Sequence, residues 1–526
     1  MNARLTSLPG SAITGPIAWA VARARVARWD RFAGDPMPVQ QRTLLAHCKS
    51  AARTELGRQH DLGSIKSYDE FRARVPLRTY ADYEPMLDRM RAGARDVIWP
   101  GLIRYFGNSS GTSHTRANNK FLPISDEQVR WQQKAGMDCL ARYLVTYEDR
   151  SFPGGFLLAL MPPSNLKREG DVLTASNPGI MQLHAPAITR AIVLPKPDVR
   201  DIENYDQKLK AIAEHYLDYD IRALTGTTCW FSILFDRVLE AARERGRRAN
   251  VVADVWPNLR VLLGGGVFAE PYRPLIAERY GRAVPIIDTY NATEGGIFAV
   301  SDRRDDDAML VLPDRGVFFE FVPRTEHGRP DARRYPLWDV VPGVDYSVVL
   351  TTSSGLFAYY IGDFVRFTSV FPHRMVFAGR ASGMLSITQE LTTQLEIERA
   401  VSSAQQTAPC SIVDYSAAAE VGSAATGKGR YLFFIEFDRV PADLEAFAGA
   451  IDRELCVQNR VYREHRKDEV AILAPKIVPL VRGATHRFME ALGSTSVQQK
   501  FPRIVDERRR DLLRRFARNP SLEVLQ

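Results

Sequence analysis

The feature that most constrains the fold of this chain is a run of seven small residues, Gly107-Asn108-Ser109-Ser110-Gly111-Thr112-Ser113, followed by Lys120. The run cannot fill a core or hold a helix, yet Arg104-Tyr105-Phe106 before it has the pattern of a buried strand. Glycine lets a backbone approach an anion closely, while successive N–H groups and hydroxyls point at it and a nearby lysine adds charge. A phosphate-binding loop and an ordinary Ser/Gly surface turn both fit, and the Walker pattern is absent here.

Length and apolar patterning predict an α/β protein with more than one domain. The 526 residues are too many for a single core. Continuous apolar runs alternate with stretches of helical periodicity, which is typical of buried strands in an α/β domain. We expect these strands at residues 156–161, 191–194, 261–263, 284–287 and 375–378.

The first part of the chain has helical periodicity. Between residues 16 and 58 apolar side chains recur at spacings of three and four, as in Trp19, Ala22, Val26, Trp29 and Ala33. A second segment continues this pattern through Leu44, Leu45 and Cys48. We expect these helices to pack as a cap on the α/β domain.

The composition and the cysteine spacing bear on the class of protein and on its cellular compartment. With 45% hydrophobic and 25% charged residues, the chain is typical of a soluble globular protein and not of a disordered one. Its five cysteines are scattered without the paired spacing of zinc or redox sites, which predicts free thiols in a reducing compartment. The apolar runs fall short of the roughly 20 residues of a membrane span, and no signal sequence is evident. We therefore expect a cytoplasmic monomer without membrane attachment.

The net charge of +8 raises the question of nucleic acid, but basic and acidic residues alternate along most of the chain. The densest basic cluster is Arg508-Arg509-Arg510 with Arg514-Arg515. No interleaved aromatic residues or binding module accompany it, so we interpret it as a solvated helix face. Apart from a nucleotide, no nucleic-acid partner is expected.

Two glycine-bearing junctions follow predicted strands. One strand leads into Gly264-Gly265-Gly266, and another leads into Asp288-Thr289-Tyr290-Asn291-Ala292-Thr293-Glu294-Gly295-Gly296. Ligands of open α/β sheets bind beyond the strand ends, so such segments can converge on one site. Tyr290 offers a ring for stacking a base, Thr293 a hydroxyl and Glu294 a hard oxygen for Mg²⁺. Taken separately, each of these could equally be ordinary turn chemistry.

A third candidate is Asp363, which follows an aromatic strand and a glycine in Tyr359-Tyr360-Ile361-Gly362-Asp363. A carboxylate there could accept two hydrogen bonds from a ribose diol, although a turn-forming Gly-Asp is the simpler interpretation. Gly379-Arg380 ends the next predicted strand.

The order of these motifs resembles the adenylate-forming superfamily of acyl-CoA synthetases, luciferases and peptide-synthetase adenylation domains. The motifs are the serine loop with its trailing lysine, Tyr-x-x-Thr-Glu, aromatic-x-Gly-Asp and Gly-Arg. The chain is more closely similar to the plant auxin-responsive branch, the Gretchen Hagen acyl acid amido synthetases, and to its bacterial relatives. The marks of that branch extend from about residue 16 to 505: Val75-Pro76, Tyr80, Tyr83-Glu84-Pro85, Ser109 to Ser113, Leu385-Ser386-Ile387 and Gln498-Gln499-Lys500-Phe501-Pro502-Arg503.

This chain differs from the usual pattern of that branch at positions that bear on the choice of substrate more than on activation of the acid. Ala358 and Tyr360 stand where the family usually has basic residues, and Glu390-Leu391 replaces an Asp-Lys pair. The loop 114–119 is also longer than the family's usual spacing to the lysine. These departures argue against taking over a plant hormone as the substrate, and the sequence leaves the identity of the acid open.

The resemblance implies a large N-terminal adenylate-forming domain, residues 1–383, and a small mobile C-terminal α/β domain, residues 384–526. A strand at 431–437 and a helix at 442–457 are expected in the latter. The small domain is expected to swing between two half-reactions about a short hinge near residues 379–383.

The resemblance also implies the chemistry. ATP and Mg²⁺ would activate a small carboxylic acid as an acyl adenylate with release of pyrophosphate, and an amine, expected to be that of an amino acid, would then attack. The resemblance implies that the phosphates are bound by Ser109, Ser110, Gly111, Thr112, Ser113 and Lys120. It implies magnesium binding for Glu294, adenine binding for Tyr290, ribose binding for Asp363 and transition-state stabilisation for Lys500. Further nucleotide contacts are implied for Gly265, Asn291, Thr293 and Arg380. Two alternatives remain: a ligase that passes the acyl group to coenzyme A or a carrier thiol, and a nucleotide- or acyl-binding protein without turnover.

Overall fold

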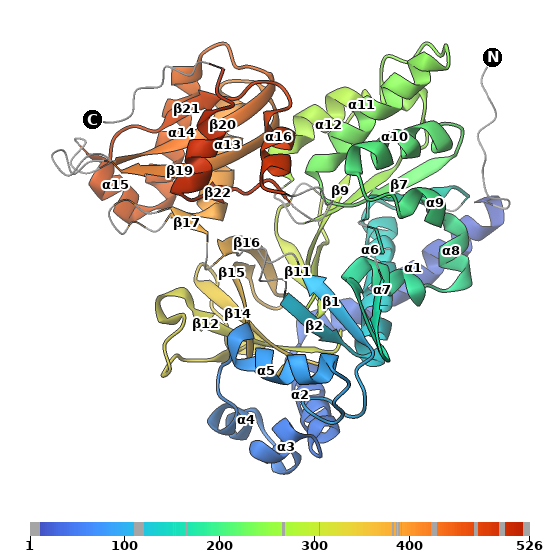
Figure 1. Ribbon diagram of the computed structural model, residues 1–526, viewed down its shortest axis with the longest axis vertical. Helices are drawn as coiled ribbons and strands as arrows, with labels where there is room; N and C mark the ends of the chain where they lie inside the picture. The colour runs from blue at the N-terminus through green and yellow to red at the C-terminus, as the bar shows by residue number, and fades with distance from the viewer. Residues whose placement is uncertain are drawn as a thin grey trace.

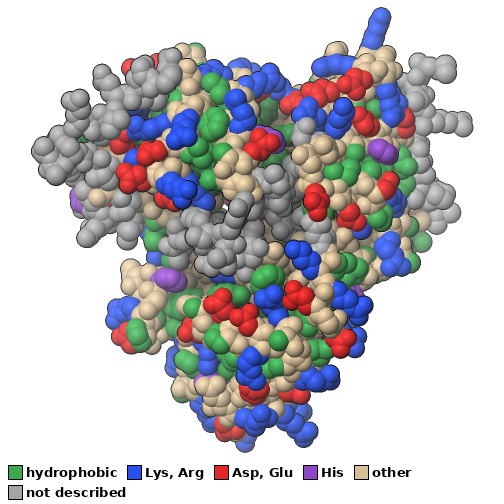
Figure 2. Space-filling model, viewed as in Figure 1, with side chains coloured by type: hydrophobic (Ala, Val, Ile, Leu, Met, Phe, Trp, Pro, Cys, Tyr) green, Lys and Arg blue, Asp and Glu red, His purple; other side chains and the backbone are tan. Residues whose placement is uncertain are grey.

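The computed structural model describes residues 11–109, 120–150, 152, 154–161, 163–164, 166–265, 269–304, 306–380, 383–385, 387, 390, 392–421, 429–467, 472–493 and 500–518. A large N-terminal body built on a long mixed sheet carries a smaller α/β body at one end (Figure 1). In the parts just named, no helix is both long and apolar enough to cross a membrane. On the face shown in Figure 2, basic and acidic side chains are interspersed over both bodies.

The N-terminal segment forms helices, as the periodicity predicts. The helices are α1 (Ser11–Gly34), α2 (Met37–Ala51), α3 (Glu55–Gln59), α4 (Tyr68–Arg74) and α5 (Tyr80–Arg91). The predicted stripe on α1 is buried at Ala22, Val26, Trp29 and Ala33, and α1 packs along α6 (Asp126–Thr146). Helix α2 is held to the sheet by Gln40, whose amide donates to the carbonyls of Pro313 and Val317 at 2.6 and 2.8 Å.

The central sheet has twelve strands in the order β13-β12-β14-β15-β16-β11-β10-β9-β8-β7-β3-β6. Strands β6, β3, β7, β8 and β9 run parallel, and the strands from β9 to β13 pair antiparallel. Their bounds are β3 (Phe156–Ala159), β6 (Val193–Leu194), β7 (Ile221–Thr225), β8 (Val261–Gly265), β9 (Ile286–Ala292), β10 (Gly296–Ser301), β11 (Met309–Val311), β12 (Val317–Pro323), β13 (Tyr335–Pro336), β14 (Asp345–Thr352), β15 (Tyr359–Ser369) and β16 (Arg374–Arg380).

Helices connect the parallel strands, and the last four of them in chain order bury the largest core cluster among the described residues. The connecting helices are α7 (Asn177–Leu183), α8 (Ala187–Ile192), α9 (Pro197–Arg200), α10 (Tyr205–Tyr216), α11 (Cys229–Glu244) and α12 (Arg273–Tyr280). Leu158, Leu224 and Leu262 from three adjacent strands pack there with Phe235 and Tyr280. These strands can be buried because helices cover them.

Three sequence expectations need correction. Ala191 and Ile192 complete α8, so the strand expected at 191–194 begins only at Val193. Strand β9 continues to Ala292, which places Tyr290 and Asn291 within a strand, because β9 forms a hairpin with β10. Asp363 lies inside β15 and not beyond its end, because Gly362 at φ 85° lets the strand bend and continue.

A separate four-stranded sheet carries the serine motif. Its order is β2 (Lys120–Ile124), β1 (Tyr105–Ser109), β5 (Val172–Ser176) and β4 (Lys167–Glu169). Strands β1 and β2 form a hairpin in which Ser109 lies opposite Lys120. The strand expected at 104–106 is thus β1, but it continues through Gly107, Asn108 and Ser109, the first three residues of the predicted loop, because they pair with β2. The rest of that loop lies outside the described residues.

The C-terminal body is a second α/β unit. Its sheet has the order β21 (Lys476–Pro479), β20 (Gly429–Arg439), β19 (Ser411–Val421) and β22 (Ile504–Val505). Its helices are α13 (Gln394–Thr407), α14 (Leu444–Gln458), α15 (Arg460–Arg466), α16 (Ala484–Ala491) and α17 (Glu507–Arg514). The strand expected at 431–437 and the helix expected at 442–457 are confirmed as β20 and α14.

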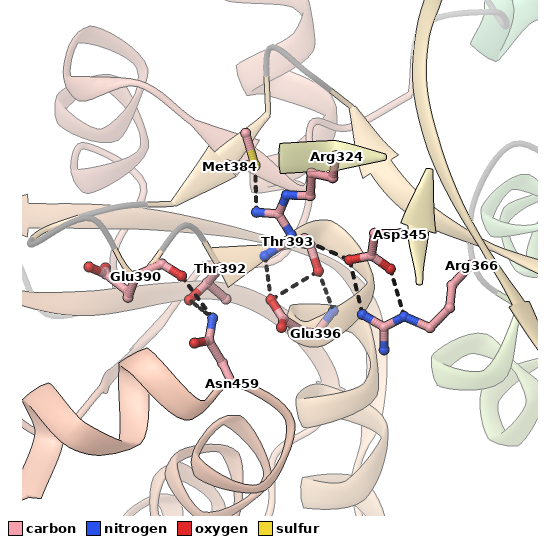
Figure 3. Close-up of polar contacts among 9 residues, drawn as sticks. All are labelled: Arg324, Asp345, Arg366, Met384, Glu390, Thr392, Thr393, Glu396 and Asn459. Atoms are coloured by element: carbon pink, nitrogen blue, oxygen red, sulfur yellow. Dashed lines mark hydrogen bonds and ion pairs between the residues drawn. The ribbon is translucent and has the colours of Figure 1, made fainter. Parts of the chain in front are cut away.

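Polar contacts hold the junction between the two bodies (Figure 3). On the N-terminal side, Arg366 donates to both carboxylate oxygens of Asp345 at 2.6 and 3.0 Å, and Arg324 reaches the sulfur of Met384 at 2.8 Å. Met384 begins β17 (Met384–Leu385), which pairs with β18 (Thr392–Thr393). Thr393 and Glu396 then form a capping box that starts α13.

Candidate active site

One cavity of about 1250 Å³ lies beyond the carboxyl ends of β7 and β8, at the turn between β9 and β10. It is lined by residues from widely separated segments, among them Lys120, Gly265, Asn291, Thr293, Glu294, Asp363 and Lys500. Pockets for one small ligand usually measure about 300–1,000 Å³. The volume therefore leaves room for a nucleotide and a second substrate together.

The strand that precedes the serine loop packs directly on the β9–β10 turn. A Cβ atom at Gly107 would lie 2.7 Å from Thr293 Cγ2 and 2.9 Å from Ile124 Cδ1, so only glycine fits there. Next to it, Asn108 lines the cavity, and its buried Oδ1 has no hydrogen-bond partner within the described chain. Two motifs far apart in sequence are thus in contact at the cavity.

Of the predicted phosphate contacts, Lys120 is described and lines the cavity, with its Nζ 5.5 Å from the centre of the Tyr80 ring. The backbone of Ser109 ends β1, but its side chain lies outside the described part of the chain. Ser110, Gly111, Thr112 and Ser113 also lie outside the described residues.

Glu294 lies in the turn between β9 and β10, and it is largely buried while lining the cavity. The turn is fixed from α6: Gln128 Nε2 donates to the Thr293 carbonyl at 3.0 Å, and Gln128 in turn accepts from Ser354 Oγ. Glu294 lies close enough to Tyr359 to contribute to that phenol's raised pKa, of which burial is the larger cause. A carboxylate held this way presents hard oxygens to the cavity.

Tyr290 and Asp363 are brought together, but not as the sequence suggested. The Tyr290 hydroxyl donates to Asp363 Oδ2 at 2.9 Å, and the ring lies 5.4 Å from Phe298 and 6.0 Å from Phe377, centre to centre. The ring is only 6% exposed and belongs to the core, whereas Asp363 lines the cavity. The expected stacking surface is therefore packed against protein, and the hydroxyl orients Asp363 instead.

The remaining nucleotide candidates lie at neighbouring strand ends. Gly265 ends β8, and a Cβ there would lie 2.8 Å from Thr289 Oγ1. Asn291 donates to the same hydroxyl at 3.2 Å and lines the cavity. Arg380 lies opposite Asp363 in the β15–β16 pairing, and its side chain is outside the described part.

Lys500 enters the cavity from the C-terminal body, and the residues that follow it are firmly held. Phe501 packs on Phe488 with ring centres 5.4 Å apart, and Ser416 Oγ donates to the Pro502 carbonyl. Residues 504–505 then join the sheet as β22 beside β19. The backbone on one side of Lys500 is thus part of the C-terminal sheet.

Arg503 connects this segment to the N-terminal body. Its buried guanidinium donates to Asp414 Oδ1 at 2.5 Å and to the Tyr415 carbonyl at 2.7 Å, and it also donates to the hydroxyl of Tyr272. Tyr272 lies in the short 3₁₀ turn η3 (Glu270–Tyr272) before α12, and its hydroxyl donates to Asp414 at 2.7 Å. This network, which we call the Arg503 latch, joins the two bodies three residues after Lys500.

Comparison with known proteins identifies the family. Sequence profiles of the GH3 family match in order: the N-terminal domain at residues 25–212, the central domain at 310–380 and the C-terminal domain at 395–509. The chain belongs to the GH3 family. The predicted family is therefore confirmed.

Curated relatives of this GH3 chain are plant proteins. A probable indole-3-acetic acid-amido synthetase, GH3.12 of Oryza sativa subsp. japonica, is 24% identical over 91% of this chain and 93% of its own. The indole-3-acetic acid-amido synthetase GH3.3 of Arabidopsis thaliana is 22% identical and covers 89% of each chain.

Solved structures share the GH3 fold. The AtGH3.15 acyl acid amido synthetase in complex with 2,4-DB has a TM-score of 0.74 at 19% identity, covering 96% of this chain and 98% of that one. A 2-hydroxyisobutyryl-CoA ligase in the postadenylation state has a TM-score of 0.57 at 16% identity, covering 91% of both chains. The fold class expected from the sequence is confirmed.

Sequence reasoning missed part of the lining of this GH3 cavity. Thr225-Gly226-Thr227 at the end of β7 repeats the pattern of a strand followed by small polar residues, and this signal could have found it. Gln132 of α6 and Asn177 of α7 also line the cavity and are linked by a 2.9 Å hydrogen bond. They carry no local motif, because only helix packing brings them there.

Asp288 gives a pH-dependent prediction. Burial raises the pKa of this carboxyl to about 7, helped by Asp307, Glu270 and Glu398 and opposed by Arg273. The unfolded chain releases this proton near its ordinary pKa of 3.8, so between about pH 4 and 7 the folded state binds more protons and loses stability as pH rises. Asp288→Asn cannot ionise, so it should be increasingly more stable than the parent protein, by up to roughly 4 kcal/mol above pH 7.

Urea unfolding of both proteins from pH 4.5 to 8 measures this difference. Asp171→Asn, at an exposed turn, serves as the control and should show no such trend. A stability difference between Asp288→Asn and the parent that stays constant with pH would show that Asp288 is ionised throughout.

Proposed function

We propose that this protein is an ATP-dependent acyl acid amido synthetase. It joins a carboxylic acid to AMP with release of pyrophosphate and passes the acyl group to an amine, namely that of an amino acid. The observation that carries the proposal is a single cavity, in a chain of the GH3 family, lined by Lys120, Glu294 and Asp363 from the N-terminal body and by Lys500 from the C-terminal body.

The chemistry explains why such a cavity is needed. A carboxylate resists attack by an amine because its charge repels nucleophiles and oxide is a poor leaving group. Attack of the carboxylate on the α-phosphorus of ATP expels pyrophosphate and leaves AMP as a good leaving group on the acyl carbon. The amine then attacks that carbon, AMP departs, and the ammonium loses a proton to give the amide. The protein's work is positioning and charge neutralisation.

We assign the residues as follows. The segment from Ser109 to Ser113 and Lys120 bind the phosphates, Asp363 accepts hydrogen bonds from the ribose diol, and Lys500 donates to the oxygens that gain charge during adenylation. Tyr290 holds Asp363 in place by its hydrogen bond. Further nucleotide contacts come from Gly265, Asn291, Thr293 and Arg380.

Magnesium fits this arrangement. Within the described residues no group of three or more His, Cys, Asp or Glu side chains could hold a metal ion. Mg²⁺ in nucleotide sites, however, is usually bound by one or two carboxylates together with phosphate oxygens and water. Glu294, largely buried at the cavity wall, supplies such a carboxylate. Bound there with ATP, Mg²⁺ would neutralise phosphate charge.

We further propose that residues 1–383 and 384–526 are two domains and that the second reorients between the two half-reactions. Leu395 supports a boundary in this region, because it packs on Phe364 and Val376 of the N-terminal body while Ile397 enters the C-terminal core. The chain is only 22–27% identical to the plant relatives. We propose that it is one of their bacterial counterparts and that it is a cytoplasmic monomer.

The products test the function. Purified protein is incubated with ATP, Mg²⁺, a panel of acids, a mixture of amino acids and coenzyme A, and the products are identified by mass. An acyl amino acid is the expected product. A thioester in place of the amide would make the protein a CoA ligase, and ATP binding without any acyl product would make it a binding protein.

Asp363→Ala should weaken ATP binding tenfold to a hundredfold while the protein stays folded. A hydrogen bond to a charged group contributes about 1.5–3 kcal/mol, and a tenfold change in affinity corresponds to about 1.4 kcal/mol of binding free energy. Calorimetric titration with ATP measures the change. Tyr290→Phe keeps the buried ring but removes the hydroxyl that orients Asp363, so it should show a smaller loss. Unchanged ATP affinity in folded Asp363→Ala would remove this residue from the nucleotide site.

A further inference from the structure

The cavity extends well beyond the proposed nucleotide site, along helix α6. Gln132 of α6 lies at the end of the cavity near the proposed nucleotide site, because the Gln132 side chain lies against Gly296, two residues after Glu294. Leu140 of the same helix still lines the cavity. At 1.5 Å per residue, these two positions are about 12 Å apart along the helix axis. We call this extension the α6 arm.

The walls of the α6 arm are aliphatic. Met137 and Leu140 of α6 face the cavity together with Met161, Met181 of α7 and Ile192 of α8. Among the described residues that line the cavity, none is Phe, Tyr, Trp or His, and the only carboxylates are Glu294 and Asp363 at the nucleotide end. Methionine is unbranched and adaptable, so these walls can follow a flexible chain.

Basic side chains also line the arm, but most of them are already engaged by the protein. Arg25 of α1 pairs with the buried carboxylate of Asp138. The ammonium of Lys134 lies 4.8 Å from the centre of the Trp131 ring. Their stems can cover apolar surface while their charged ends point elsewhere. Four further basic residues line the cavity: Lys196 donates to backbone carbonyls and Arg200 pairs with Asp201, whereas Arg130 and Arg190 add two more cations. Since four of the six basic side chains already contact protein groups, the arm presents mainly aliphatic surface to a ligand.

We propose that the acyl acid is a flexible aliphatic acid whose carboxylate lies at the Glu294 end and whose chain extends along α6. This inference rests on the proposed function and names its substrate class. Flat aromatic acids gain most from ring contacts, which the described lining does not provide. The relatives named for indole-3-acetic acid would thus differ from this chain in the acid that they activate.

Gly136 of α6 provides a direct way to test the arm. It lines the cavity, and a Cβ atom built there would meet no other atom within 4 Å. The neighbouring Met137 is 52% exposed, so the arm is open at this point. Gly136 is exposed as well, so the backbone has room for a Cβ atom at this position, and a side chain there would add bulk at the open wall of the arm.

The experiment compares acids by ATP–pyrophosphate exchange. The series is hexanoate, octanoate, decanoate and dodecanoate, with benzoate, indole-3-acetate and decanedioate for comparison. Each buried methylene should raise kcat/KM about fourfold until the arm is filled. Gly136→Leu should lower kcat/KM for decanoate at least tenfold and for hexanoate much less. Gly136→Ala should have a small effect, and Gly449→Ala, in α14, should leave the length profile as it is.

The outcomes separate this inference from the function on which it rests. Exchange with aromatic acids in preference to the aliphatic series, a preference for decanedioate over decanoate, or a length profile unchanged by Gly136→Leu would each overturn the aliphatic assignment while leaving the synthetase intact. No exchange with any acid would overturn the proposed function itself, and this inference with it.

Discussion

Lys500→Ala is expected to lower acid-dependent pyrophosphate release by about 10²–10³-fold while the protein stays folded and binds ATP nearly normally. The lysine lies in the cavity together with Glu294 and Asp363, although it belongs to the C-terminal body. A donor aimed at the oxygens where charge develops stabilises the transition state more than bound ATP, so rate falls more than affinity. The amine step is expected to use another domain orientation and should be affected much less.

Two half-reactions must therefore be measured separately. Pyrophosphate release reports adenylation, and conversion of a supplied acyl adenylate to amide reports the second step. Lys49→Ala, which changes an exposed lysine at the end of α2, is the control for charge alone. Near-normal adenylation in Lys500→Ala would mean that Lys500 only lines the cavity and does not donate to the oxygens that gain charge during adenylation.

Arg503→Met is expected to destabilise the C-terminal body by about 3–5 kcal/mol, because it breaks a buried ion pair by removing one partner. The substitution leaves the carboxylate of Asp414 without its guanidinium, and Glu398 loses an opposite charge 3.7 Å away. It also removes the hydrogen bond from Arg503 to the Tyr272 hydroxyl, so that Tyr272 keeps only its hydrogen bond to Asp414 in this network. Adenylation should fall as well, since the latch holds the segment that carries Lys500.

Hydrogen exchange of the β19 and β20 amides measures this effect within the C-terminal body. Faster exchange there, with the N-terminal sheet protected as before, is the expected pattern. Arg508→Met changes an exposed arginine in the same segment, and its free energy of unfolding should stay within about 0.5 kcal/mol of that of the parent protein. Equal protection in Arg503→Met and Arg508→Met would show that the latch contributes little.

Much of the fold could be predicted from local pattern. The helical periodicity fits α1, the apolar runs at 156–161 and 261–263 fit β3 and β8, and the helix expected at 442–457 is α14. The prediction failed where one residue changes the backbone path. Gly362 at φ 85° carries β15 past the expected turn, so Asp363 lies within a strand opposite Arg380.

The candidate site was predictable only in part. Lys120, Glu294, Asp363 and Lys500 could be named from motifs, and all four line one cavity. The burial of the Tyr290 ring between Phe298 and Phe377 could not be foreseen, because Phe298 comes from a β9–β10 hairpin that was not expected and Phe377 from β16, far along the chain. The α6 arm was missed for the same reason, since its walls come from helices without a local motif.

ATP–pyrophosphate exchange tests most directly whether this cavity forms an acyl adenylate. We predict that labelled pyrophosphate enters ATP only when a suitable carboxylic acid is present, and that Lys500→Ala abolishes most of this exchange. Exchange that proceeds equally without acid, or protein that binds ATP but exchanges with no acid tested, would contradict this prediction.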